Sequence, residues 1–214
     1  MVPSFVSTAI LFSAWSRLLF ASIATTTHCW PKTSASFVIN WGCSTAAVLI
    51  ETLRQLKSTP HELYFVFSVQ EEVGVRGATT AAFGIDPDLG LASDVTGTGD
   101  TPRRSGRRME VSLGKGPAIK VRDGGMLADP RVVSWMVKTA EKAGLPYQLE
   151  ILEGGSTDAR AIQLTRAGVP AGCLSIPCRY VHSPSEMVDF GDVENAVRLL
   201  VELISKPVKL DERA

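Results

Sequence analysis

Four short stretches of the sequence place acidic or imidazole side chains behind apolar, β-rich runs. Glu71 and Glu72 are adjacent and follow one such run, and Asp94 lies near the end of the next. Asp158 lies in a Gly-rich loop behind a third run, and His182 follows a fourth. Because the carboxyl ends of parallel strands meet at one edge of a sheet, we expect these side chains to converge there.

The residue types predict hydrolytic metal chemistry at this edge. Carboxylates and imidazole are ligands that zinc and cobalt accept, and hydrolysis also needs a carboxylate that takes a proton from metal-bound water. Just past the end of a strand, one of two neighbouring glutamates can bind the metal while the other accepts the proton from the water. Taken singly, each residue also has an ordinary structural explanation as a solvated surface acid, a turn cap or a hydrogen-bonding histidine.

The elements that must position these residues alternate between β and helical patterns from Thr45 onward. The predicted helices cover 45–57, 74–84, 130–143, 157–168 and 192–205, the last one capped by Asp192. The predicted strands cover 63–69, 89–100, 147–152 and 171–177, with a hairpin over 108–121. The run at 63–69 is nearly continuous in apolar residues, which indicates a strand covered on both faces. The alternation implies a largely parallel α/β sheet sandwiched by helices.

Composition bounds the class of protein. A chain of 214 residues with 45% hydrophobic and 21% charged residues can bury one α/β domain. The formal charge is zero, which argues against a nucleic-acid partner and favours a small or peptidic ligand. Four cysteines form no zinc pattern and fit a reduced cytoplasmic compartment at least as well as disulfides: Cys29, Cys43, Cys173 and Cys178.

Residues 1–43 differ in composition from the rest of the chain. Residues 1–50 contain no Asp or Glu. The stretch Phe5–Ala24 is mostly apolar, although Arg17 would cost about 2.5–3.5 kcal/mol near the centre of a membrane helix. A membrane span, a targeting segment and sequence foreign to the domain are three interpretations that stay open. We expect residues 1–43 to form an atypical leader that packs poorly on a domain comprising 44–214.

Five motifs carry a family resemblance. In chain order they read VQEEVGVRGA, ASDVTGTGD, LGKGPAI, GGSTDA and IPCRYVHSPSE. Together they resemble the glutamyl aminopeptidase and deblocking aminopeptidase family, family forty-two of the metallopeptidases, whose members are often labelled cellulase M or endoglucanase. The resemblance covers roughly Thr45 to Val208. It implies a three-layer α/β/α zinc-peptidase-like sheet, here truncated at the N-terminus, two zinc or cobalt ions per site, and homo-oligomers that release N-terminal residues from peptides.

The resemblance also implies roles for individual residues. Glu71 takes the position of the general base, Glu72 and His182 those of ligands to one metal, and Asp94 that of a ligand to the other. A loop that lines the family's site is matched by three residues: Gly155, Thr157 and Asp158. The same loop is equally explained as a Gly-rich turn and helix cap.

Two residues of the family pattern have no match in this sequence. The family places a histidine in its earlier part and a metal-bridging aspartate, in an Asp-Asp-Arg or Asp-Asn-Arg segment, just before the helix that begins near Thr45. This chain reads SFVINWGCSTAAVL there, and the surroundings of His28 do not match. A bridging carboxylate sets the separation of two cations, so we expect weak metal binding and low activity from this chain.

Two other functions are alternatives to the aminopeptidase. An inactive remnant or interaction subunit would keep the fold without the bridging ligand. A glycosidase would also use two carboxylates, but these should flank a sugar at about 5–9.5 Å. The adjacent Glu71 and Glu72 suit metal ligation better.

Overall fold

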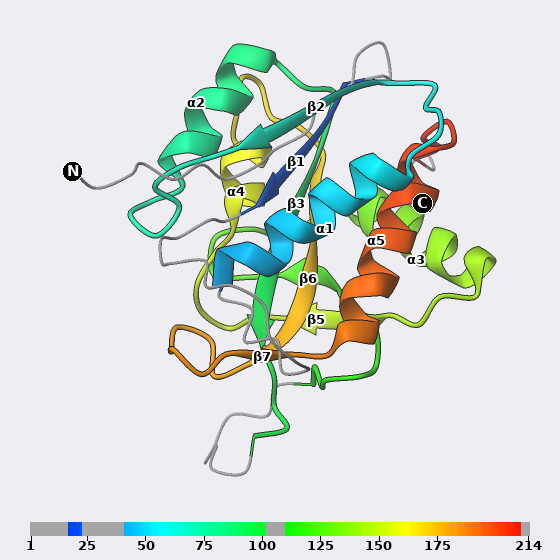
Figure 1. Cartoon of the computed structure of the whole chain (residues 1–214). Helices are drawn as coiled ribbons and strands as arrows, with labels where there is room; N and C mark the ends of the chain where they lie inside the picture. The colour runs from blue at the N-terminus through cyan, green and yellow to red at the C-terminus, as the bar shows by residue number, and fades with distance from the viewer. Residues whose placement is uncertain (1–16, 23–40, 102–109, 211–214) are drawn as a thin grey trace.

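The computed structural model describes residues 17–22, 41–101 and 110–210. Its strands are β1 Arg17–Ser22, β2 Glu62–Phe67, β3 Leu89–Gly97, β4 Ala118–Arg122, β5 Gln148–Ile151, β6 Ala171–Arg179 and β7 Met187–Val188. Its helices are α1 Trp41–Gln55, α2 Arg76–Ile85, α3 Pro130–Ala143, α4 Asp158–Gln163 and α5 Phe190–Ile204. Figure 1 shows these elements as a twisted sheet with helices packed against it.

The strands form one seven-stranded sheet in the order β2-β1-β3-β6-β4-β5, with β7 paired to β6. The strands β2, β1, β3 and β6 run parallel, and β5 is parallel to β4. Only the pairings of β4 and β7 with β6 are antiparallel, so the sheet is largely parallel, as expected. The α/β class with a central sheet flanked by helices is confirmed.

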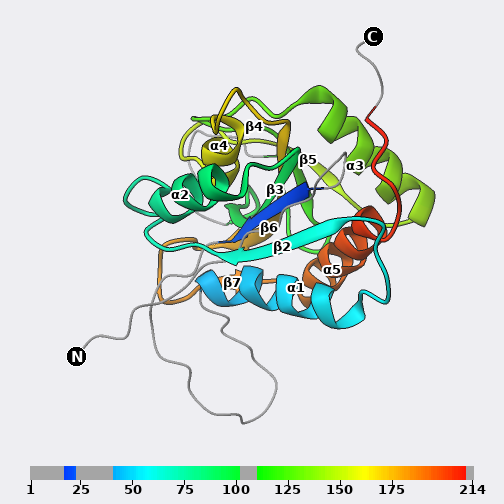
Figure 2. The same cartoon turned by 90° about the horizontal axis from the view of Figure 1, so that it is seen from above.

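The helices cover both faces of the sheet (Figure 2). On one face α1, α3 and α5 bury a core that includes Leu89 and Leu91 of β3. On the other face α2 and α4 pack over smaller side chains, such as Ala92. Gly90 lies on this second face, where an added Cβ would come within 2.2 Å of Ile162 Cγ2. The close approach of α4 to β3 therefore requires glycine there.

Helix α3 illustrates how the local sequence sets the element boundaries. The side chain of its N-cap, Asp129, accepts a hydrogen bond from Arg131 N at 2.9 Å, and Pro130 occupies the first turn. At the other end Gly144 adopts a left-handed conformation with φ 63°. The predicted helix between Pro130 and Gly144 is thus confirmed with its caps.

The strand β1 corrects the expectation that residues 1–43 pack poorly on the domain. Leu18–Ser22 pair in parallel with Leu89–Ser93 of β3, and Arg17 pairs with β2. The apolar sequence RLLFAS supplies the strand that joins β2 to β3. Part of the stretch considered as a membrane span is therefore a β-strand, and the rest of residues 1–40 lies outside the described residues. No helix in the described ranges is both long and apolar enough to cross a bilayer.

Strand β2 is covered on both faces, as its apolar run indicated. Leu63 and Phe65 pack against the core on one face of the sheet, and Tyr64 and Val66 pack against the core on the other. These side chains are only half-buried, and β2 has a neighbouring strand on one side only.

The hairpin expected over 108–121 does not form in the described part of the chain. Of that segment only β4 is a strand, and no strand is found between Glu110 and Pro117. Gly114 N and Gly116 N instead donate to the carboxylate of Asp192, at 2.8 and 2.6 Å. The turn is thus attached to helix α5, and Gln148 of β5 also holds it by donating its side-chain amide to Ser112 O and Gly116 O at 2.9 and 2.8 Å.

The sequence predicted that Asp192 caps α5, and this prediction is wrong. The cap is Asp189, whose side chain accepts hydrogen bonds from Gly191 N and Asp192 N at 2.8 and 3.3 Å. Asp192 lies in the first turn and is buried, which leaves its carboxylate free to hold the turn before β4.

We expect Asp192→Ala to lower the free energy of unfolding by about 1–3 kcal/mol, because two backbone N–H groups lose a charged acceptor. Urea denaturation followed by circular dichroism measures this. Glu194→Ala, which removes an exposed carboxylate from the same helix, should change stability by less than about 0.5 kcal/mol. Equal stabilities for the two variants would contradict the assigned role of Asp192.

Candidate functional site

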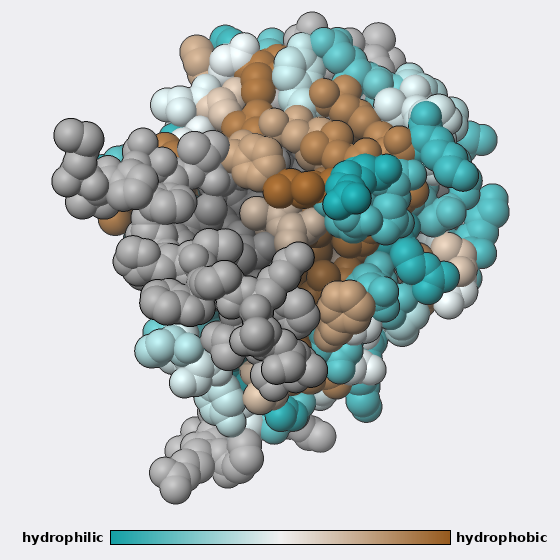
Figure 3. Space-filling model, in the orientation of Figure 1, coloured by the Kyte–Doolittle hydropathy of each residue, from teal (hydrophilic) through white to brown (hydrophobic). Residues whose placement is uncertain are grey.

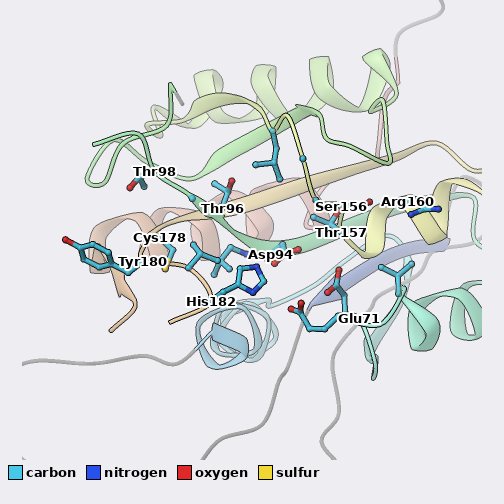
Figure 4. A pocket seen from close by; sticks show the side chains of 18 of the residues that line it. Glu71, Asp94, Thr96, Thr98, Ser156, Thr157, Arg160, Cys178, Tyr180 and His182 are labelled. Carbon is cyan, nitrogen blue, oxygen red and sulfur yellow. Dashed lines mark hydrogen bonds between the residues drawn. The ribbon is translucent and has the colours of Figure 1, made fainter. Parts of the chain in front are cut away.

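A pocket of about 640 Å³ lies at the carboxyl ends of β3 and β6. Four segments form its wall: the loop after β2, the end of β3, the loop between β5 and α4, and the loop after β6. Six of the seven site residues expected from the sequence line it: Glu71, Glu72, Asp94, Gly155, Thr157 and His182. The seventh, Asp158, is buried next to this lining. Figure 4 shows Glu71, Asp94 and His182 close together in the middle of the pocket.

A compact turn after β2 positions the two glutamates. Gly74 N and Val75 N both donate to the carbonyl oxygen of Glu71, at 2.9 and 2.8 Å. Gly77 N closes the turn on Val69 O at 2.9 Å, and a Cβ on Gly77 would come within 2.3 Å of Val69 N. The motif therefore needs a glycine where α2 begins.

Glu71 and Glu72 have different surroundings although they are adjacent. Glu71 is half-buried, whereas Glu72 is exposed. Burial, followed by the charges of Asp158, Glu72 and Asp123, raises the pKa of Glu71 to about 8. Burial and the charge of Glu186 raise the pKa of Glu72. The two carboxylates are thus able to take separate roles.

Asp94 lies on β3 at the floor of the pocket and is almost fully buried. Its Oδ1 accepts a hydrogen bond from Val95 N at 2.6 Å. Burial and then the charge of Glu71 raise its pKa well above the usual range, against the opposing charge of Lys120.

Lys120 belongs to a buried polar network beneath the pocket. Its Nζ donates to Glu150 Oε1 at 2.6 Å, and Thr96 Oγ1 donates to the same oxygen at 2.5 Å. Lys120 and Glu150 are both 0% exposed. Burial alone would lower the pKa of Lys120, but the Glu150 carboxylate outweighs it and holds that pKa above its usual value. Because Thr96 lines the pocket, the network connects β3, β4 and β5 under the site.

Asp158 supports the site from the start of α4. It is 1% exposed, and Ser68 Oγ donates to its Oδ2 at 2.6 Å. Burial raises the pKa of Asp158 to about 7, although the hydrogen bond from Ser68 opposes the shift. Within the described residues its Oδ1 has no hydrogen-bond partner.

His182 follows β6 in a backbone conformation with φ 68°, which is uncommon for a residue with a side chain. Its backbone N–H donates to Glu186 Oε1 at 2.9 Å, and Glu186 is buried. Burial lowers the pKa of the His182 imidazole. The neutral ring that this favours is the form that binds metals.

Sequence reasoning missed several supporting residues. Lys120, Glu150 and Ser68 lie inside strands or at a strand end, where nothing in a single sequence distinguishes them from surface positions. Glu186 was visible in the motif IPCRYVHSPSE, four residues after His182, but it had no assigned role.

The donor types in the pocket fit a divalent cation. Glu71, Asp94 and Asp158 are buried or half-buried carboxyl groups with raised pKa values, and a cation would offset their mutual repulsion. However, among the described residues no three His, Cys, Asp or Glu side chains are arranged to hold a metal ion. Catalytic zinc sites usually have three protein ligands, so the described residues supply the chemistry of such a site but not a complete set.

Comparison with known proteins identifies relatives. The family model described as M42 glutamyl aminopeptidase matches residues 42–199. A putative aminopeptidase from Acetivibrio thermocellus is 53% identical over 163 residues, which cover 76% of this chain and 48% of that protein. A lysyl aminopeptidase from Pyrococcus furiosus is 40% identical, with 76% of this chain and 46% of that protein covered.

Similar solved structures also include aminopeptidases. An aminopeptidase from the archaeon Desulfurococcus kamchatkensis superposes with a TM-score of 0.72 at 44% identity, covering 76% of this chain and 46% of that one. The chain thus spans about half the length of the curated relatives it matches.

Proposed function

This chain belongs to the M42 glutamyl aminopeptidase family, and from that membership we propose that its pocket serves a metal-dependent aminopeptidase that releases N-terminal residues from peptides. The observation that carries the proposal is the gathering of Glu71, Glu72, Asp94 and His182 in one pocket. Relatives at 53% and 40% identity are named as aminopeptidases. Peptides are therefore the proposed substrates.

Within this proposal Glu71 is the general base. It is the more buried of the two glutamates, and its carboxylate faces the centre of the pocket beside Asp94 (Figure 4). A carboxylate that is partly withdrawn from water is a stronger proton acceptor than a solvated one. Glu72 and His182 are the proposed ligands of one zinc or cobalt ion, and Asp94 is a proposed ligand of the second.

The same proposal assigns this chain a low activity of its own. No Asp or Glu precedes Glu51, so no carboxylate from that part of the sequence can bridge two ions. Glu72 and His182 are one ligand short of the usual three. An inactive remnant is the second candidate function, and the missing carboxylate is the observation that favours it.

Metal content and peptide hydrolysis, measured on the same sample, test the proposal. After equilibration with zinc or cobalt and removal of free metal, we expect less than one ion per chain. Release of N-terminal residues should be slower than that of the complete Acetivibrio relative by about 10²-fold or more. Chelation should abolish it, and N-acetylated peptides should not be cleaved.

Three results would contradict parts of this proposal. Two tightly held ions with fast turnover would show that the site is complete. Turnover no higher than the rate without protein would support the inactive remnant. Cleavage of a β-glucan without peptide hydrolysis would favour the glycosidase, for which the adjacent Glu71 and Glu72 are poorly placed.

We also propose that the protein forms homo-oligomers, as the family resemblance implies. Figure 3 shows hydrophobic side chains gathered on the face that carries α1 and β2. Within α1, Ile50 and Leu53 are 48% and 42% exposed, although both are large apolar residues. Exposed apolar patches of this kind are typical of interaction surfaces.

A further inference from the structure

The loop between β6 and β7 carries His182 into the pocket. Residues 178–179 of β6 pair antiparallel with residues 187–188 of β7, so the two ends of the loop lie side by side. Figure 4 shows the imidazole of His182 in the middle of the pocket. The conformation of the segment 180–186 therefore sets the position of this ring.

The backbone of this loop is unusual at two residues. Tyr180 and His182 have φ values of 59° and 68°, in the left-handed region that residues with a Cβ disfavour. Ser183 N closes a turn by donating to Tyr180 O at 3.1 Å. The segment 180–186 contains no glycine that could adopt such values without strain. A residue with a side chain keeps this conformation only where surrounding contacts hold it.

The side chain of Glu186 provides such a contact from across the loop. The backbone N–H of His182 donates to Glu186 Oε1 at 2.9 Å. Glu186 is 4% exposed, although glutamates are seldom buried in proteins. A backbone N–H bonds more strongly to a carboxylate than to a neutral acceptor. Glu186 thus bonds to a residue whose backbone conformation needs support.

Glu186 also lies close to Glu72, the other side chain assigned to the same ion. Its charge raises the pKa of Glu72, after the larger effect of burial. Glu186 itself is not part of the pocket lining that the described residues form, whereas Glu72 and His182 both are. The Glu186 carboxylate therefore lies behind the two proposed ligands.

We propose that Glu186 is a positioning residue, whose carboxylate holds the His182 backbone so that the imidazole points at the metal position shared with Glu72. The inference rests on the proposed function, in which His182 and Glu72 bind one ion. Groups that hydrogen-bond behind metal ligands orient those ligands before the ion arrives. A ligand that is already held loses less conformational entropy on binding, so the ion binds more tightly.

Variants of Glu186 separate its hydrogen bond from its charge. Glu186→Met fills about the same space without an acceptor oxygen, whereas Glu186→Gln keeps an acceptor oxygen and loses the charge. Ser185→Ala removes an exposed side chain of the same loop and is the control. Urea denaturation checks that each variant is folded, and Glu186→Ala takes the place of Glu186→Met if the latter does not fold.

NMR on the metal-free chain gives the first measurement. We expect the His182 N–H to exchange with deuterated water at least about 10-fold faster in Glu186→Met than in the parent, because it loses its acceptor. The ring signals of His182, assigned with a His182→Ala spectrum, should also shift in Glu186→Met. The exchange rate and the ring signals should stay close to those of the parent in Glu186→Gln and Ser185→Ala.

A zinc titration followed by the same ring signals gives the second measurement, and it detects weak binding. We expect Glu186→Met to lower the zinc affinity by about 10–100-fold, the usual effect of losing a group that orients a ligand. Glu186→Gln should lose less than about fivefold, because charge effects next to the exposed Glu72 are weakened by solvent. Ser185→Ala should bind zinc as the parent does.

Several results would overturn the proposal. Parent values for the exchange rate and the zinc affinity in Glu186→Met would show that the hydrogen bond positions nothing. Equal losses of zinc affinity in Glu186→Met and Glu186→Gln would assign the effect to charge. Faster exchange without a change in the ring signals would confine the effect of Glu186 to the backbone.

Failure of the proposed function gives a different result. Zinc that moves no His182 signal even in the parent chain would contradict the metal role of His182. Ring signals of the metal-free chain that shift in Glu186→Met but not in Glu186→Gln would still uphold the positioning role of Glu186.

Discussion

Replacing Lys120 by methionine is expected to lower the free energy of unfolding by about 3–5 kcal/mol, because it leaves a carboxylate buried without its cation. Lys120 and Glu150 are both 0% exposed, and their Nζ–Oε1 distance is 2.6 Å. Methionine has a similar length and fills the same space, so the loss reports on charge and not on a cavity. Urea denaturation of the parent and the variant measures the difference.

A double variant is the matched control for this prediction. Lys120→Met combined with Glu150→Leu removes both charges, and replacing a buried ion pair by apolar residues is often neutral or stabilising. We expect the double variant to recover most of the lost stability, apart from the hydrogen bond that Thr96 donates to Glu150. A single variant that loses less than about 1 kcal/mol would show that the buried Glu150 side chain does not depend on Lys120 for its stability.

Most elements from Thr45 onward, the hairpin over 108–121 excepted, were predictable because each carries a local signal. The helix that ends at Gly144 has a capping aspartate, a proline in its first turn and a left-handed glycine. The positions of Glu71, Asp94 and His182 in one pocket follow from their places near or after the ends of strands, since the ends of parallel strands share one edge. Such signals depend only on near neighbours in the chain.

Features that depend on distant partners could not be predicted in this way. The strand Arg17–Ser22 is recognisable only from its pairing with β2 and β3, because its own composition also fits a membrane or targeting segment. The carboxylate of Asp192 serves a turn 76 and 78 residues earlier, so its position in the sequence suggested a helix cap instead. Lys120 faces Glu150 through strand pairing in the same way.

The pocket lining also combines features that the local sequence predicts with features that only the fold determines. Glu71 and Glu72 were recognised as a pair, but their different burial results from the turn that Gly77 closes on Val69.

Glu71→Gln is expected to reduce release of N-terminal residues by about 10²–10⁴-fold, the usual contribution of a general base. Glutamine keeps the shape of the side chain but cannot accept a proton. Because the parent chain is expected to be slow, a fluorogenic amino-acid amide is the appropriate substrate. The apparent KM should change little, since Glu71 is proposed to act on water and not to hold the substrate.

Stability separates a catalytic role of Glu71 from a structural one. Burial and the neighbouring carboxylates Asp158, Glu72 and Asp123 raise the pKa of Glu71 to about 8, so its charge is unfavourable in the folded protein. A neutral glutamine relieves this repulsion, and Glu71→Gln should therefore unfold at the same or a higher urea concentration than the parent.

The control for this experiment is Glu194→Gln, which neutralises an exposed carboxylate of α5 outside the pocket lining and should keep the parent rate. A Glu71→Gln rate within about threefold of the parent would mean that another group accepts the proton. A lower rate accompanied by lower stability would assign Glu71 to the fold instead. Only a slow variant that remains stably folded supports Glu71 as the base, because that combination separates the loss of a proton acceptor from the loss of structure.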